Sequence, residues 1–160
     1  MQPTVEHSTY IEAPPADVYR LLATGEGLDS WFTTGAEVDA RPGGSITFRW
    51  RNFGLDAIEA EDGGPVLEAV PGEVFSFHWS PGHPDRPTTV RIELKPYGRG
   101  TRVDLTETGF DAGDEKSLAA ALMVATGWGE ALTFLKYALE VPDAYTHPCR
   151  WRSDAETSAA

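Results

Sequence analysis

The sequence is poor in cysteine and in basic residues, and both shortages exclude classes of protein. Cys149 is the single cysteine in 160 residues, so an internal disulfide framework is excluded. Lysine and arginine together number 13 against 25 acidic residues, which gives a formal net charge of −12. So acidic a chain is unsuited to non-specific binding of DNA, RNA or anionic membranes, and we expect no nucleic-acid partner.

Long hydrophobic runs are also missing. No apolar run approaches the roughly 20 residues that a transmembrane helix needs, which predicts no membrane insertion. Residues 1–4 have neither the basic nor the apolar segment of a secretory signal. We therefore expect a cytoplasmic protein of one domain, because 160 residues can bury a core without disulfides or metal.

The sequence contains none of the common catalytic or cofactor-binding motifs. There is no G-x-S-x-G elbow, phosphate-binding loop or dinucleotide fingerprint, and the Gly-Gly pairs mark turns. The four histidines do not cluster, and His147-Pro148-Cys149 lacks the second pair of ligands that would complete a zinc site. The motifs therefore predict no catalytic residue, no metal and no cofactor.

A long amphipathic helix is the clearest feature that is present. Residues 116–140 carry apolar side chains at three- and four-residue steps, which predicts one stripe facing a core: Leu118, Leu122, Ala125, Trp128, Leu132, Leu135 and Leu139. Gly127 and Gly129 lie in the middle of this helix, where each costs about 1 kcal/mol relative to alanine. We expect the close approach of another backbone or of a ligand to compensate.

Most of the chain before this helix has the pattern of β-strands. Ile46, Phe48 and Trp50 alternate with polar residues, as expected for a strand with one buried face. Two short helices are predicted at residues 16–23 and 28–32. Strands are predicted at residues 4–12, 37–40, 46–51, 55–61, 66–70, 74–79, 90–95 and 102–107, with a turn at 62–65. The pattern predicts an α+β fold in which an antiparallel sheet of six or seven strands wraps around the C-terminal helix.

Seven short motifs occur in this order: Ala13-Pro14-Pro15, Trp31-Phe32, Arg41-Pro42-Gly43-Gly44, Phe75-Ser76-Phe77-His78-Trp79, Gly100-Thr101-Arg102-Val103, Thr106-Glu107-Thr108-Gly109-Phe110 and Gly127-Trp128. In these motifs the chain resembles the START-like (SRPBCC) superfamily, and more narrowly the family named after the C-terminal domain of the activator of heat-shock protein 90 ATPase. The resemblance implies a helix-grip fold with a cavity for hydrophobic or amphipathic small molecules between the sheet and the long helix. We place this domain at residues 1–142 and expect residues 143–160 to form an irregular or disordered tail.

Aromatic side chains are the first candidates for a binding site. Six of them share the inner face by strand alternation or helical phase: Phe48, Trp50, Phe75, Phe77, Trp79 and Trp128. Any one of them is simplest to explain as core, but the resemblance favours a pocket lined by part of the set. Trp31 and Phe32 are expected at the mouth of that pocket, and Leu122 is expected to line it from the helix.

Glu107 is the polar candidate. It shares the strand parity of Val103 and Leu105, which predicts an inward side chain near the end of the strand. A buried carboxyl group must find hydrogen-bond partners or shift its pKa upward. The alternative is that the strand has already ended and leaves Glu107 in solvent.

Three functions are compatible with the sequence. The first is binding of a hydrophobic or aromatic small molecule without catalysis. The second is a cyclase- or hydrolase-like enzyme that uses Glu107, which requires a second titratable group within hydrogen-bond reach. The third is a co-chaperone-like or stress-related interaction module with a chaperone or a second copy as partner, which a large exposed apolar patch would favour.

Overall fold

Seven antiparallel strands form one sheet in the order β1-β7-β6-β5-β4-β3-β2. The computed structural model describes residues 1–152. The strands are β1 (Val5–Ile11), β2 (Glu37–Val38), β3 (Ser45–Phe53), β4 (Ile58–Val70), β5 (Val74–Trp79), β6 (Thr88–Tyr97) and β7 (Gly100–Thr108). The helices are α1 (Pro15–Ala23), α2 (Gly25–Asp29), the long α3 (Glu115–Glu140) and a 3-10 turn, η1 (Pro148–Arg150).

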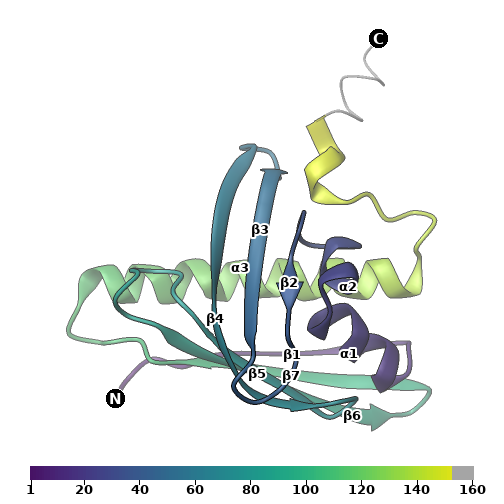
Figure 1. Ribbon diagram of the computed structural model, residues 1–160, viewed down its shortest axis with the longest axis horizontal. Coiled ribbons are helices and arrows are strands. Elements are labelled where there is room, and N and C mark those ends of the chain that lie inside the picture. Colours follow the sequence, from purple (N-terminus) through teal and green to yellow (C-terminus); the bar gives the residue numbers. More distant parts are fainter. Residues whose placement is uncertain (153–160) are drawn as a thin grey trace.

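The sheet curves around α3. Figure 1 shows α3 crossing β3 and β4, with α1 and α2 beside one end of it. α3 also packs along β1, the strand that the order of the sheet places at the edge farthest from β2. The predicted fold class, a helix-grip arrangement with two short helices after the first strand, is confirmed.

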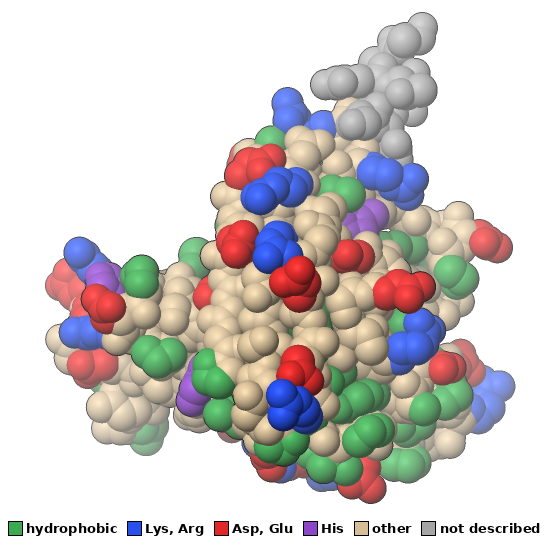
Figure 2. All heavy atoms as spheres, viewed as in Figure 1, with side chains coloured by type: hydrophobic (Ala, Val, Ile, Leu, Met, Phe, Trp, Pro, Cys, Tyr) green, Lys and Arg blue, Asp and Glu red, His purple; other side chains and the backbone are tan. Residues whose placement is uncertain are grey.

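Side-chain alternation explains which face of the sheet is buried. Inward residues recur at every second position and are almost fully buried: Ile46 and Phe48 on β3, Phe75, Phe77 and Trp79 on β5, Val90, Ile92 and Leu94 on β6, and Val103 and Leu105 on β7. The outer face is polar. Figure 2 shows acidic and basic side chains interleaved over β3 and β4, where Arg49 pairs with both Glu37 and Glu61.

β4 corrects the prediction of two strands separated by a turn at residues 62–65. It is one strand of 13 residues. Its first part pairs with β3 through Pro65, and from Val66 onward it pairs with β5. A Cβ on Gly63 would lie 2.1 Å from the Ile46 carbonyl oxygen, and one on Gly64 would lie 2.4 Å from that of His78. The glycines therefore allow close backbone approach where the strand changes partners, and they form no turn.

The second helix begins earlier than the predicted residues 28–32. α2 starts at Gly25 because the Thr24 hydroxyl caps it and accepts a hydrogen bond from the Gly27 nitrogen at 2.9 Å. Thr24 has an extended backbone, so it ends α1 and begins α2. Trp31 and Phe32 follow α2 and are both buried.

α3 is continuous through Gly127 as predicted, but its buried stripe differs in phase from the predicted one. Asp114 caps the helix, and the buried residues are Ala120, Ala121, Val124, Trp128, Ala131, Leu132 and Leu135. Leu122 is 73% exposed, so the prediction that it points inward is wrong; Leu118 and Ala125 are exposed as well. Small residues face inward here because the loop between β5 and β6 comes so close that a Cβ on Gly82 would lie 2.9 Å from that of Ala120.

For the two helix glycines, the structure contradicts the expected approach of another backbone within residues 1–152, whereas the alternative of a ligand stays a prediction. A Cβ built on Gly127 or Gly129 would meet no atom within 4 Å. Both positions face open space, so no close contact of the described chain compensates for their low helix propensity.

The chain returns to the body of the molecule after α3. From Pro142 to Arg152 it runs irregularly past α2, with η1 beside the end of β3 (Figure 1). Residues 153–160, for which the sequence predicts disorder, lie outside the described residues. α3 is long and apolar enough to cross a membrane by length and composition, but it is the helix that packs on the sheet, and the same test selects such core helices.

Candidate functional site

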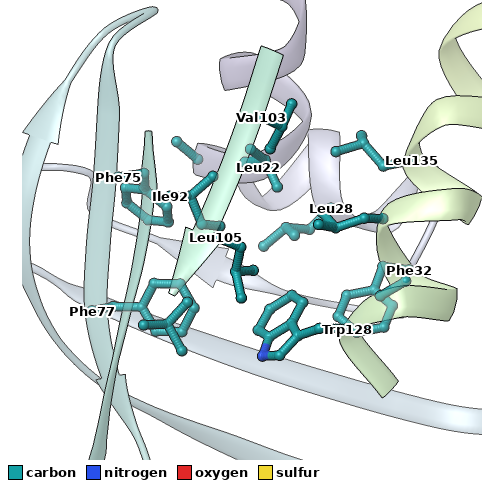
Figure 3. Close-up of a cluster of buried hydrophobic side chains, with 14 of the residues drawn as sticks. Leu22, Leu28, Phe32, Phe75, Phe77, Ile92, Val103, Leu105, Trp128 and Leu135 are labelled. Carbon is teal, nitrogen blue, oxygen red and sulfur yellow. The ribbon is translucent and has the colours of Figure 1, made fainter. Parts of the chain in front are cut away.

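Eight of the ten predicted site residues form a continuous run of aromatic rings from α2 across the sheet to α3. The ring contacts, given as centroid distances, are Trp31–Phe32 at 4.7 Å, Phe32–Trp50 at 5.4 Å, Phe48–Trp50 at 5.5 Å, Phe48–Phe77 at 5.4 Å, Phe75–Phe77 at 5.5 Å, Phe48–Trp79 at 5.5 Å and Trp79–Trp128 at 5.2 Å. Figure 3 shows Trp128 reaching from α3 into the same cluster as Leu105 and Phe77. The middle of the interior is therefore packed with rings that touch one another.

Glu107 lies at the α3 end of this run. Its side chain is fully buried, as the strand parity of β7 predicts. Trp79 and Trp128 each donate an indole N–H to its carboxyl group, to Oε1 and Oε2 respectively, and both N···O distances are 2.7 Å. The Thr88 hydroxyl donates to Oε1 at 2.6 Å. Two strands and the helix thus converge on one carboxyl group.

Burial raises the pKa of the Glu107 carboxyl, and this effect outweighs the three hydrogen bonds, which lower it. The Asp62 carboxylate on β4 raises the pKa further through its charge. Asp62 itself accepts backbone N–H groups from Gly63 at 2.7 Å and Ser80 at 3.0 Å, yet burial raises its pKa too. The sheet therefore holds two carboxyl groups near its interior, both in surroundings that disfavour their charge.

The partners of Glu107 also limit its chemistry. An indole N–H can only donate, so Trp79 and Trp128 satisfy the ionised carboxylate but offer no acceptor for the proton of the neutral acid. Only the Thr88 hydroxyl can reverse its role. None of the three groups bonded to Glu107 titrates, so the second titratable group that the enzyme hypothesis requires is not among them.

A hollow of about 400 Å³ lies next to this cluster. Its walls are the loop between β5 and β6, the loop between β7 and α3, and the first turns of α3. It is lined by Gly82, His83, Asp85, Arg86, Thr88, Gly109, Phe110, Asp114, Lys116, Ser117 and Ala120. Thr88 belongs to both features, since it lines the hollow and donates its hydroxyl to Glu107. Arg86 and Asp114 form an ion pair between the two loops.

The structure gathers nine of the ten predicted residues, the eight aromatic residues and Glu107, and leaves Leu122 outside. None of the ten lines the hollow, however. Thr88 was not among the predicted site residues, although its parity with Val90 and Ile92 indicates an inward side chain. Phe110 and Ala120 were not predicted either, and the sequence gives no comparable signal for them.

Comparison with known proteins agrees with this architecture. Residues 12–140 match the family described as "Activator of Hsp90 ATPase homolog 1-like protein". No curated protein matches the chain.

Solved structures that are similar to the chain share its fold. The solution structure of the Aha1 dimer from Colwellia psychrerythraea is 22% identical, with a TM-score of 0.72 over 87% of this chain and 97% of that one. Protein CV1439 from Chromobacterium violaceum is 24% identical, with a TM-score of 0.70 over 86% and 97%. CalU16 from Micromonospora echinospora is 19% identical, with a TM-score of 0.65 over 97% and 86%. At these identities the likeness establishes the fold alone.

Proposed function

The chain belongs to the family of Activator of Hsp90 ATPase homolog 1-like proteins, and on that premise we propose that it binds an amphipathic small molecule between the sheet and the N-terminal half of α3. The hollow beside α3 is the binding site, and Thr88 in its wall connects it to the buried Glu107 and the ring cluster behind it. The observation that carries the proposal is the double role of Thr88, which joins the hollow to the buried carboxyl group.

The chemistry of the walls indicates the kind of ligand. Phe110 and Ala120 are buried and offer apolar surface. The rim carries charges of both signs: Arg86 is paired with Asp114, and Asp85, His83 and Lys116 complete the polar lining, with Lys116 as the cation outside that pair. A ligand with an apolar body and a polar or anionic end satisfies both parts of the hollow. Burial of the apolar body supplies affinity at about 25 cal/mol per Å², and the rim orients the polar end.

The dye anilinonaphthalene sulfonate tests this proposal, because it combines fused aromatic rings with an anionic group. We expect saturable binding at one site per chain, with fluorescence energy transfer from the tryptophans beside Glu107. Ala120→Phe places a ring in the hollow and should prevent dye binding by occupying its space, and overpacking should lower folding stability by about 1–3 kcal/mol.

Ala119→Phe is the matched control, because Ala119 is the neighbouring alanine on the exposed face of α3. Ala119→Phe should leave the affinity of the hollow for the dye unchanged. Equal dye affinity in wild type and Ala120→Phe, with both proteins cooperatively folded, would place the binding site elsewhere. Native mass spectrometry of protein taken gently from its own host then identifies a co-purified ligand.

A second candidate function, association with a protein partner, is favoured by the outer face of α3. Residues 117–129 contain no charged side chain, although the whole chain is 24% charged. Leu122 and Met123 are 73% and 58% exposed on this face. Leu122→Glu should abolish any self-association seen by analytical ultracentrifugation, or weaken the capture of a purified chaperone. Thr133→Glu, nearer the C-terminal end of the same helix, serves as the control.

A further inference from the structure

The segment after α3 packs across the end of the molecule where α2, β3 and α3 meet. We call residues 142–152 the C-terminal strap. Two of its aromatic side chains pack on Phe134 of α3, with centroid distances of 6.4 Å for Tyr145 and 5.5 Å for Trp151. Figure 1 shows the strap leaving the end of α3 and running past α2.

Hydrogen bonds to main-chain groups hold the strap on the sheet side. The Asn52 side-chain amide donates to the Cys149 carbonyl at 2.9 Å, and the Gly54 N–H donates to the Pro148 carbonyl at 3.1 Å. Asn52 and Gly54 both have positive φ, so this end of β3 is shaped to present them. The strap is thus bound by specific contacts and does not merely lie on the surface.

On the α2 side, the strap supplies donors to two carbonyl groups that follow the helix. The Tyr145 hydroxyl donates to the Trp31 carbonyl, and the His147 Nε2 lies 3.2 Å from the Thr33 carbonyl oxygen. His147 is only 8% exposed, so its ring is part of the packed end of the molecule. The strap is therefore bonded to the main chain of Trp31, whose ring is the first of the aromatic run.

One ring nitrogen of His147 is a hydrogen-bond donor and the other is an acceptor. Nε2 faces a carbonyl and must carry the proton, while Nδ1 accepts the Cys149 N–H at 3.1 Å and caps η1. The bonded ring is therefore neutral, with its proton on Nε2. A second proton on Nδ1 would point directly at the Cys149 N–H and remove the cap of η1.

We propose that the C-terminal strap is an acid-released closure, which stays docked while His147 is neutral and undocks when Nδ1 of His147 takes up a proton. Undocking frees the Trp31 and Thr33 carbonyls and the face of Phe134, and so opens the α2 end of the aromatic interior. This opening lies at the opposite end of α3 from the hollow, and the inference does not depend on a ligand binding there.

Two charged groups act on the His147 ring from the elements packed around it. From η1, Arg150 disfavours the imidazolium, while from α2, Asp29 favours it. Asn52 at the end of β3 and Gly54 just after it bond to the strap and are uncharged, and so is Phe134 on α3. Burial is the largest effect and lowers the pKa of His147 from its usual 6.5.

The direction of the pH dependence follows from this lowered pKa. A base whose pKa is lowered by docking binds more protons when undocked, so docking is fully favoured above the free value near 6.5 and weakens as pH falls below it. One proton limits the change to at most about tenfold in the docking equilibrium per pH unit.

Cys149 is a built-in reporter, since it is the single cysteine of the chain and lies partly buried in the strap. The rate of its reaction with dithiodipyridine is measured from about pH 7.5 to about pH 5.5. At each pH, the rate for the same protein in denaturant is divided by the rate for the folded protein. The ratio measures protection by docking and cancels the pH dependence of the thiol itself. We expect protection to decrease severalfold over this range, whereas a constant ratio would overturn the proposal.

Two variants separate His147 from other titrating groups. His147→Asn keeps an acceptor for the Cys149 N–H but cannot be protonated, so its protection should be lower than in wild type and independent of pH. His83→Asn removes an exposed histidine of the β5–β6 loop and should retain the wild-type pH dependence. If His147→Asn kept the wild-type decrease, the proton would be bound elsewhere and the proposal would fail.

Discussion

Replacement of Glu107 by glutamine tests the energetics of the buried carboxyl group. Glu107→Gln keeps the size of the side chain but removes its charge, in a site with no exposed surface. The amide carbonyl can accept from two of the three donors, and its NH2 group then faces the remaining donor. If the site stabilises the carboxylate more than solvent does, the contact between the amide NH2 group and the remaining donor lowers the free energy of unfolding by about 1–3 kcal/mol. If burial dominates, the loss of the charge offsets that cost.

The raised pKa of Glu107 decides which outcome we expect. A carboxyl group with a raised pKa binds more protons in the folded state, so its contribution to stability is complete below the ordinary value of 4.5 and is lost as pH rises through the folded-state value. Glutamine does not titrate. The stability of Glu107→Gln relative to wild type should therefore increase with pH, by about 1.4 kcal/mol for each pH unit within that window.

Chemical denaturation from about pH 4 to about pH 8 covers this window from below the ordinary pKa of 4.5 upward, and a low protein concentration is needed because the isoelectric point lies near 4.6. Glu130→Gln, on the exposed face of α3, is the matched control for the loss of one negative charge. A difference that instead moves in favour of wild type as pH rises would refute the reasoning. It would mean that the three donors outweigh burial and hold the carboxylate charged.

Four further substitutions test other features of the structure. Gly127→Ala and Gly129→Ala should each raise the free energy of unfolding by about 1 kcal/mol, because nothing lies within 4 Å of the added methyl group; destabilisation would mean that an unseen partner packs there. Trp128→Phe should lower stability by about 1–3 kcal/mol, through the lost hydrogen bond to Glu107 and the smaller ring, and a neutral result would show that the indole N–H contributes little. Tyr145→Phe removes the donor to the Trp31 carbonyl and should increase the reactivity of Cys149 at every pH without changing its pH dependence.

The sequence alone determined most of the sheet, because side-chain parity within a strand is a local property. The alternation around Phe48, Phe77 and Val103 places each of these residues on the inner face, and the same parity places Glu107 there. The sequence also predicted the bounds of the long helix: the predicted residues 116–140 differ from the observed Glu115–Glu140 by one residue at the start and by none at the end. In the strands, burial repeats the period of the sequence, so no knowledge of their neighbours is required to place a side chain on the inner or outer face.

Tertiary structure alone decided the phase of α3 and the course of β4. The first half of α3 is apolar around most of its circumference, so periodicity cannot choose a buried side; the close approach of Gly82 to Ala120 does, and it leaves Leu122 in solvent. Gly63 and Gly64 have the local pattern of a turn, but the backbones of β3 and β5 that approach them hold the chain extended.

The partners of Glu107 and the anchors of the strap also depend on long-range contacts. Trp79, Thr88 and Trp128 stand 19 to 28 residues from Glu107 in the sequence, and Tyr145 reaches a carbonyl group 114 residues away. Local patterns can predict that a side chain is buried, but they do not identify the distant groups that will contact it. The folded sheet and helix bring these groups together, and with them the hollow and the closed end of the interior.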